Sequence, residues 1–283
     1  MNAAWLVRRR STPLLASVLL LACGETHVTL LAPFTNHADA GSAGAGTSAD
    51  AGAGTDAAIP PSSTGHLIHR YSFDGEGTRV RDSIGTAHGS LVGGAVLDGA
   101  GHVSLDGEDD YVNLPNRLLS RLTDATLIAW IVWNGGPCWQ RAFDFGSTDA
   151  GEGLTGDATS SLFATPLRCP GTGPATSFQT ISDEFGSIDS DAPFPVLKVS
   201  ALAVVVDGAA RQLRLYAAGE PLGTGKAPPL ALLSDENDWL GRSQWVQDKP
   251  LRGTYDEFRI YDVALSDAEL AALEAAGPDK LAF

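Results

Sequence analysis

From residue 66 onward the sequence is a succession of short β-rich segments, and this pattern leaves few folds open. Clusters of glycine, aspartate, asparagine and proline separate the segments and are typical of turns. Residues 127–133 are apolar on both faces, which predicts a central strand covered on each side. One helix is expected, with Ser266 and Glu269 as a capping box and Gly277 at its end. The pattern predicts an all-β fold, a two-sheet antiparallel sandwich with one short C-terminal helix.

Residues 1–23 have the features of a bacterial export signal. Three arginines precede an apolar run of nine residues, which is too short to span a bilayer. The run ends at Ala22 and Cys23, and this junction resembles the lipobox of bacterial lipoproteins, in which the cysteine thiol carries the diacylglycerol. The alternative is an ordinary secretory peptide with an incidental cysteine. Gly24 replaces the aspartate that retains lipoproteins in the inner membrane, so outer-membrane or surface display is expected.

Residues 24–65 are expected to form a disordered tether rich in alanine, glycine and serine. Its second part, residues 38–65, contains no aromatic residue and a single isoleucine. Such a stretch buries too little apolar surface to offset the conformational entropy of folding. We expect a flexible spacer here, with residues 66–283 as one domain.

The charge of the chain is acidic. The 283 residues include 34 Asp and Glu against 19 Lys and Arg, for a formal charge of −15. An acidic surface repels phosphate backbones, so we expect no nucleic-acid partner. The charge is compatible with neutral sugars, basic partners or calcium. The alternative is that it only keeps an exported protein in solution.

Three stretches carry a resemblance to a known family. The body is similar to LamG-like domains of the concanavalin A-like jelly-roll superfamily, and the similar stretches are residues 69–89, 105–133 and 239–266. The resemblance implies two stacked, curved sheets, with a concave face or a rim loop for a ligand. It also implies carbohydrate recognition or adhesion, and calcium at an edge of the sandwich. Residues 146–195 match none of these motifs, and we expect a long variable loop region there.

This sequence departs from the family pattern at two positions. Ser200 stands where the family commonly has a histidine that opens the strand. The turn at 216–219 lacks the usual aspartate, which caps the turn or contacts a ligand. Both departures weaken a ligand assignment made from the family alone.

Two cysteines remain once Cys23 is assigned to lipid. Cys138 and Cys169 are expected to form a disulfide in an oxidising compartment. The bond closes a loop of about 30 residues, which corresponds to about 3 kcal/mol of stabilisation. The alternative, a pair of thiols that bind a metal, lacks nearby histidines.

The aspartates suggest a calcium site assembled from distant loops. Asp74, Asp82 and Asp256 lie in stretches that the family resemblance brings together, and calcium takes six to eight oxygen ligands. Residues 108–110 are a second candidate. The alternative is that these aspartates only satisfy backbone groups in turns.

No catalytic constellation is visible in the sequence. All six histidines lie at or before His102, and no Gly-x-Ser-x-Gly motif is present. The carboxylate spacing of related glucanases is absent as well. Trp239 and Trp245 flank Arg242 in a loop-like setting where a ring can stack on a sugar, and packing in the core or rim is the alternative.

These observations lead to one functional hypothesis with two competitors. We expect no enzyme, but an extracytoplasmic, lipid-anchored module that binds carbohydrate or glycoprotein and contacts the membrane only through its N-terminal lipid. The first alternative is a structural or adhesion protein of the envelope that binds no sugar. The second is a glycoside hydrolase.

Overall fold

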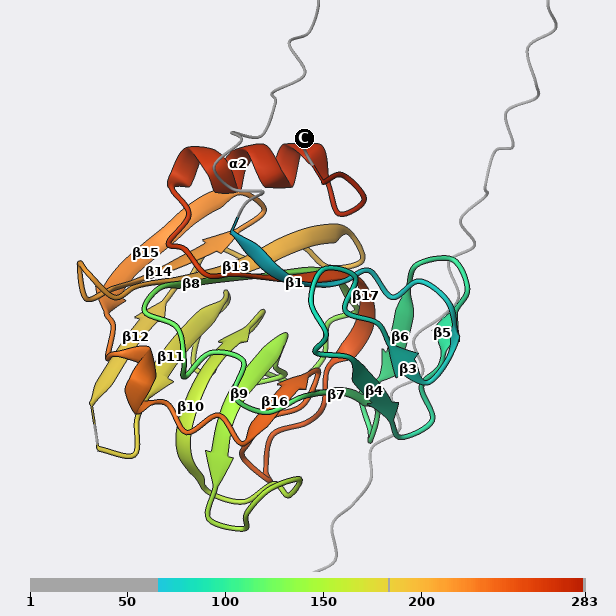
Figure 1. Ribbon diagram of the computed structural model, residues 1–283, viewed down its shortest axis with the longest axis horizontal. Coiled ribbons are helices and arrows are strands. Elements are labelled where there is room, and N and C mark those ends of the chain that lie inside the picture. The colour runs from blue at the N-terminus through green and yellow to red at the C-terminus, as the bar shows by residue number, and fades with distance from the viewer. Residues whose placement is uncertain (1–65, 183, 282–283) are drawn as a thin grey trace, which may run out of the picture. The chain divides into compact units, whose positions relative to one another are not determined.

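The computed structural model describes residues 66–182 and 184–281. The described residues all belong to one unit. The predicted signal peptide, the lipid attachment at Cys23 and the tether therefore lie outside the described residues. Within them, two antiparallel sheets stack face to face, and a helix covers the outer side of one sheet (Figure 1).

The first sheet, sheet A, has nine strands and is the upper layer in Figure 1. Strand β1 (Leu67–Tyr71) pairs with β17 at its side. The other strands follow in the spatial order β15 (Glu220–Lys226), β14 (Gln212–Ala217), β13 (Val199–Asp207), β8 (Ala125–Trp133), β17 (Arg252–Tyr261), β6 (Val103–Asp106), β5 (Leu97–Asp98) and β2 (Glu76–Gly77).

The second sheet, sheet B, has eight strands and is the lower layer. Its spatial order is β12 (Phe185–Asp189), β11 (Ala175–Gln179), β10 (Ala158–Thr165), β9 (Phe143–Thr148), β16 (Asn237–Leu240), β7 (Tyr111–Leu114), β4 (Gly89–Val92) and β3 (Arg79–Val80). A short 3₁₀ turn, η1 (Leu230–Leu232), precedes β16. The predicted sandwich is confirmed.

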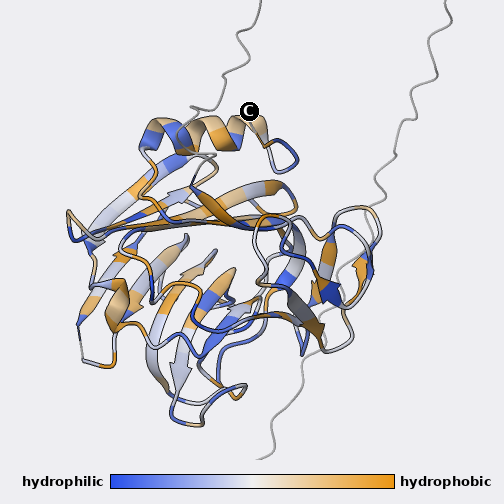
Figure 2. Cartoon of the chain, in the orientation of Figure 1, coloured by the Kyte–Doolittle hydropathy of each residue, from blue (hydrophilic) through white to orange (hydrophobic). Residues whose placement is uncertain are grey.

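Apolar residues fill two layers, one on each side of sheet A. Leu127 and Ile131 of β8 belong to the core between the sheets. Ile128 and Trp130, which point to the opposite face, pack with Leu270 of helix α2 (Asp267–Ala276). Figure 2 shows the resulting alternation of apolar and polar residues along α2. The prediction that β8 is covered on both faces is confirmed.

Helix α2 begins and ends where the sequence predicts. The Ser266 side chain accepts a hydrogen bond from the Glu269 N–H, and the Glu269 side chain binds back to the Ser266 backbone. Gly277 ends the helix with φ of 80°, a left-handed conformation that favours glycine. No helix in the described ranges is long and apolar enough to cross a membrane.

The expectation of a long loop over residues 146–195 is wrong. This segment contains β10, β11 and β12, three neighbouring strands of sheet B. Their sequences are rich in serine, threonine, glycine and alanine. The apolar alternation that marks a half-buried strand is therefore weak, although the backbone pairing is regular.

Candidate functional site

The loop between β16 and β17, residues 241–251, lies on the outer face of sheet B; we call it the 241–251 ridge. Phe143 and Phe145 of β9 belong to the core between the sheets, so Asp144 between them points outward. The backbone N–H of Gln244, in the ridge, donates to Asp144 Oδ2 at 3.0 Å. This contact fixes the ridge against the sheet.

Further hydrogen bonds hold the ridge in one conformation. The Gln244 side-chain amide donates to the carbonyls of Asp144 and Asn237, at 3.3 and 3.0 Å. Gly156, in the loop between β9 and β10, donates to the Gln244 carbonyl and accepts from Val246 N–H, at 3.0 and 3.1 Å. The ridge is therefore a preorganised part of the surface.

One side of the ridge borders a hollow of about 460 Å³, which we call the Arg242 hollow. The Arg242 guanidinium carbon lies 4.4 Å from the ring centroid of Tyr111 and 4.3 Å from that of Trp239. Ser243 and Lys249 are among the other lining residues. The hollow thus presents hydroxyl groups and both signs of charge around a cation that contacts two rings.

The other side of the ridge borders a smaller hollow of about 240 Å³, which we call the aromatic cleft. Its apolar lining comes from Trp139, Phe163 and Trp245. The rings of Trp139 and Trp245 stand nearly perpendicular to Phe163, with centroids 6.3 and 5.9 Å from it. Gln247 and Asp248 line both hollows, so the two sites are adjacent.

A buried arginine supports the aromatic cleft. The Arg141 guanidinium carbon lies 3.9 Å from the Phe163 ring centroid. Its side chain donates to Asp248 at 2.8 Å and to Asp144 at 3.4 Å. Burial raises the pKa of Asp144 to about 7, against the opposing effect of the Arg141 charge. Burial also raises the pKa of Asp248.

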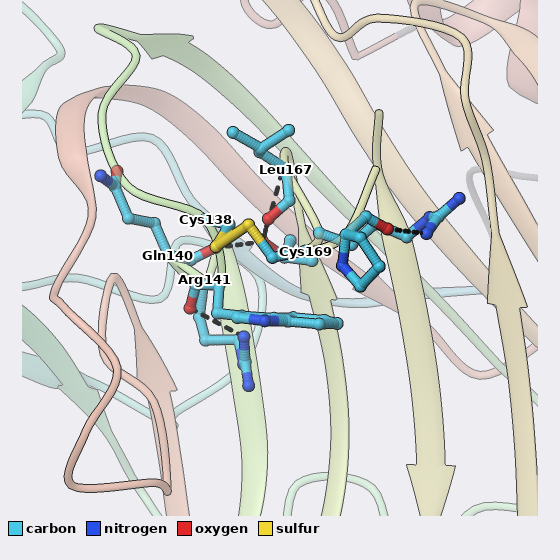
Figure 3. Close-up of a disulfide and its surroundings, with 9 residues drawn as sticks. Cys138, Gln140, Arg141, Leu167 and Cys169 are labelled. Carbon is cyan, nitrogen blue, oxygen red and sulfur yellow. Dashed lines mark hydrogen bonds between the residues drawn. A yellow bond between two sulfur atoms is a disulfide. The ribbon is translucent and has the colours of Figure 1, made fainter. Parts of the chain in front are cut away.

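The predicted disulfide between Cys138 and Cys169 is present and lies next to this cluster (Figure 3). Trp139 follows the first cysteine, and its N–H donates to the Leu167 carbonyl at 2.8 Å. The Trp139 carbonyl accepts from Arg141 at 2.7 Å. The disulfide and these two hydrogen bonds hold the backbone that carries the indole.

Of the three residues predicted to contact a ligand, two lie at the surface and one is buried. Trp239 is fully buried in β16, and its Nε1 donates to Asn113 at 3.0 Å, so its ring does not reach the surface. The prediction that Trp239 stacks on a ligand is therefore wrong: Arg242 and Tyr111 pack against the indole. Arg242 and Trp245 lie at the surface on opposite sides of the ridge.

Asp82, predicted as a calcium ligand, organises a turn. Its buried carboxylate accepts hydrogen bonds from His69 Nδ1, at 2.7 Å, and from four backbone N–H groups. Burial works to raise the pKa of Asp82, but these hydrogen bonds outweigh it, and the pKa falls below the usual value. The carboxylate thus has its full set of partners within the chain.

Asp74 and Asp256 have partners of their own. Asp74 is exposed and accepts from the Ser72 hydroxyl at 2.6 Å, and Asp256 lies 3.0 Å from His102 Nε2. Within residues 66–182 and 184–281, these two and Asp82 do not form a group with ligand atoms within 4.8 Å of one another. The structure does not assemble the predicted calcium set.

Asp106, Asp109 and Asp110 do form such a group, close to the second predicted candidate. Asp110 accepts hydrogen bonds from the N–H groups of Gly94, Ala95 and Asp106, at 2.6 to 3.2 Å. These bonds explain the cluster as the scaffold of two adjoining turns. The oxygen donors suit calcium chemically, and calcium binding stays a prediction.

Sequence reasoning missed Arg141, Phe163 and Tyr111 as site residues. Tyr111 opens strand β7, and Phe163 lies in the segment that was expected to be a loop. Trp139 alone carried a signal, because it follows a cysteine that the predicted disulfide fixes in place.

The family model of the concanavalin A-like lectin/glucanases superfamily matches residues 106–271. Domain 4 of AbnA, a GH43 extracellular arabinanase from Geobacillus stearothermophilus solved with arabinotriose, is similar in structure. The TM-score is 0.53 and the identity 17%, over 73% of this chain and 97% of that one.

Two further solved structures are similar in fold. The botulinum neurotoxin serotype D binding domain has a TM-score of 0.57 and 13% identity, over 76% of this chain and 53% of that one. A Trypanosoma rangeli sialidase in complex with 2,3-difluoro-KDN has a TM-score of 0.51 and 17% identity, over 76% of this chain and 33% of that one. No curated protein matches the sequence. At these identities the likeness establishes the fold alone.

Proposed function

Because the chain belongs to the concanavalin A-like lectin/glucanases superfamily, as the resemblance predicted, we propose that it is a carbohydrate-binding module. The site is the 241–251 ridge with the two hollows beside it. The fold by itself serves many functions, so the proposal depends on the chemistry of this surface. Two proteins of similar fold were solved in complex with arabinotriose and with 2,3-difluoro-KDN, which supports carbohydrate as the ligand class.

One observation carries the proposal: the Arg242 hollow combines an ordered cation, the Tyr111 ring and several side chains that can hydrogen-bond to hydroxyl groups. Sugar recognition requires convergent hydrogen-bond donors and acceptors beside an apolar surface. Arg242 is held in place by two rings and by a 3.3 Å hydrogen bond to the Gly153 carbonyl. A side chain that is already ordered loses little entropy when it binds.

A catalytic role has weaker support. Asp144 has a pKa of about 7, a value suited to a general acid. However, its side chain is fully buried under the ridge, where it bonds to Gln244 and Arg141. A ligand on the surface does not contact it. This geometry favours binding over hydrolysis.

We also propose that the module is held outside the cell by a lipid on Cys23. The sequence of residues 1–23 supports this, through the arginines, the short apolar run and the lipobox-like junction. Labelling cells with a tagged fatty acid tests it. The wild-type chain should take up label and fractionate with membranes, and a Cys23→Ser chain that keeps both properties would refute the anchor.

The binding proposal is tested with the purified full chain on a glycan array and by calorimetry on the glycans retained. We expect the wild type to retain neutral glycans, and Arg242→Ala to weaken binding about tenfold, which corresponds to 1.4 kcal/mol of lost contact. Arg211→Ala is the matched control, because Arg211 is an exposed arginine paired with Glu184 away from the ridge. It should bind as the wild type does.

The same array, run with calcium and with EDTA, tests the predicted ion. Retention that requires calcium would support an ion at Asp106, Asp109 and Asp110. If no glycan is retained in either condition, the proposal fails and the alternative of an envelope protein without sugar binding takes its place. Release of reducing sugar from the same glycans would revive the hydrolase alternative.

A further inference from the structure

The described chain has five tryptophans, and their burial separates them into two groups. Trp130, Trp133 and Trp239 are at most 5% exposed. Trp139 and Trp245 are partly exposed, and both line the aromatic cleft. They come from loops more than 100 residues apart in the sequence. Within this part of the chain, the indoles that a ligand can reach therefore share one small hollow.

The backbone at Trp139, which carries one of these indoles, has a strained conformation. Its φ is 65°, in the left-handed region that a bulky side chain rarely adopts. Such a conformation persists only where its surroundings enforce it, and it occurs often at binding sites. Here the Cys138 disulfide and the hydrogen bonds to Leu167 and Arg141 enforce it.

The positive charge below the cleft, on Arg141, is neutralised by two carboxylates. Arg141 is 3% exposed and pairs with Asp144 and Asp248. Its guanidinium lies between the two indoles, 5.6 and 5.3 Å from their centroids. No positive charge remains there to attract an anion. The formal charge of −15 on the whole chain acts further against phosphorylated and acidic ligands.

The size of the cleft sets the size of its occupant. At about 240 Å³ it is smaller than pockets for drug-sized ligands, which span roughly 300–1,000 Å³. It therefore takes a single small ring. Gln247 and Asp248 line both the cleft and the Arg242 hollow, so a ligand of several rings can cross the ridge.

We infer that the aromatic cleft is a subsite for one neutral sugar ring, and that a single glycan chain crosses the 241–251 ridge to occupy the cleft and the Arg242 hollow together. The apolar face of the ring lies on the indoles, and its hydroxyls bond to Gln247 and Asp248. This inference rests on the proposed function and adds a ligand class, which is a neutral oligosaccharide of several units.

The test is calorimetry of the full chain with neutral arabino-, xylo- and cello-oligosaccharides of one to six units. We expect affinity to rise with length until both hollows are filled. Trp245→Ala should weaken binding of the longer sugars about tenfold, which corresponds to a loss of roughly 1.4 kcal/mol. Their affinity should then be close to that of the short sugars. Trp245→Phe should restore most of the affinity, because it keeps a ring.

Phe185→Ala is the matched control, because Phe185 is an exposed aromatic residue on β12, the edge strand of sheet B, and does not line the cleft. Binding should also shift tryptophan emission to the blue in the wild type and less in Trp245→Ala. If the wild type binds and Trp245→Ala binds equally well at every length, the cleft is no subsite, while the proposed function stands. If the wild type binds no sugar of the series and none on the array, both fail.

Discussion

Asp238 carries a carboxyl group into the interior of the sandwich. It is fully buried, its Oδ2 accepts from Leu118 N–H at 3.2 Å, and its Oδ1 has no partner among the described residues. Burial, and then the nearby charge of Asp235, raise its pKa well above the usual value. The folded protein therefore keeps a proton on Asp238 at a pH where the unfolded chain has lost it.

The raised pKa of Asp238 predicts how the free energy of unfolding depends on pH. Above about pH 4, the ordinary aspartate pKa, the folded state binds more protons than the unfolded state, so this residue lowers stability as pH rises. Asp238→Asn removes the effect and keeps the acceptor for Leu118. We expect the variant to be more stable than the wild type at pH 8, by a margin that grows as the pH rises above 4.

Urea unfolding at pH 4 and pH 8 measures this difference. The variant and the wild type should be close at pH 4 and diverge at pH 8. The exposed Asp157→Asn controls for the loss of a negative charge and should change neither value. Equal stabilities of Asp238→Asn and wild type at pH 8 would contradict the raised pKa.

Trp239 and Trp245 show what sequence can and cannot predict about single residues. Both flank Arg242, and the local sequence does not distinguish between them. Trp239 ends up fully buried because it lies in a strand beneath Arg242, whereas Trp245 lies in the ridge. Burial of this kind depends on which segments cover the outer face of the sheet, and that is decided by contacts between residues far apart in the chain.

Among the elements, those with a strong local signal were predicted. Strand β8 and helix α2 were confirmed because an unbroken apolar run and a capping box are local signals. Strands β10 to β12 were missed because their small polar residues carry no such signal. The same strands bring Phe163 under the aromatic cleft, so the missed elements and the missed site have one cause.

The disulfide connects the segment before β9 with the one that follows β10. Its cysteines are 31 residues apart, and a loop of this length corresponds to roughly 3–4 kcal/mol in the chain-entropy model. Replacing both Cys138 and Cys169 with serine should lower the free energy of unfolding by about that amount. It should also weaken the binding of the longer neutral oligosaccharides, because Trp139 loses one of its constraints.

Urea unfolding and calorimetry with and without reductant measure these effects. Reductant should destabilise the wild type and leave the double serine variant unchanged. If the variant is as stable as the wild type and binds sugar equally well, the bond has no part in the site.

At the scale of the whole domain, the sequence predicted the two-sheet architecture but not the face that binds a ligand. The turn and strand pattern, with the family resemblance, was sufficient for two stacked sheets. The helix covers one outer face, over sheet A, and the ridge lies on the other. The face available for a ligand thus follows from how these two elements pack, which the sequence pattern alone does not reveal.

The central claim is that a neutral glycan lies across the 241–251 ridge. A crystal structure of the protein with the tightest-binding neutral oligosaccharide tests it most directly. We predict electron density for one sugar ring in the aromatic cleft, against the exposed faces of Trp139 and Trp245, and for a second beside Arg242. Density for the sugar on another surface, with both hollows empty, would contradict the claim.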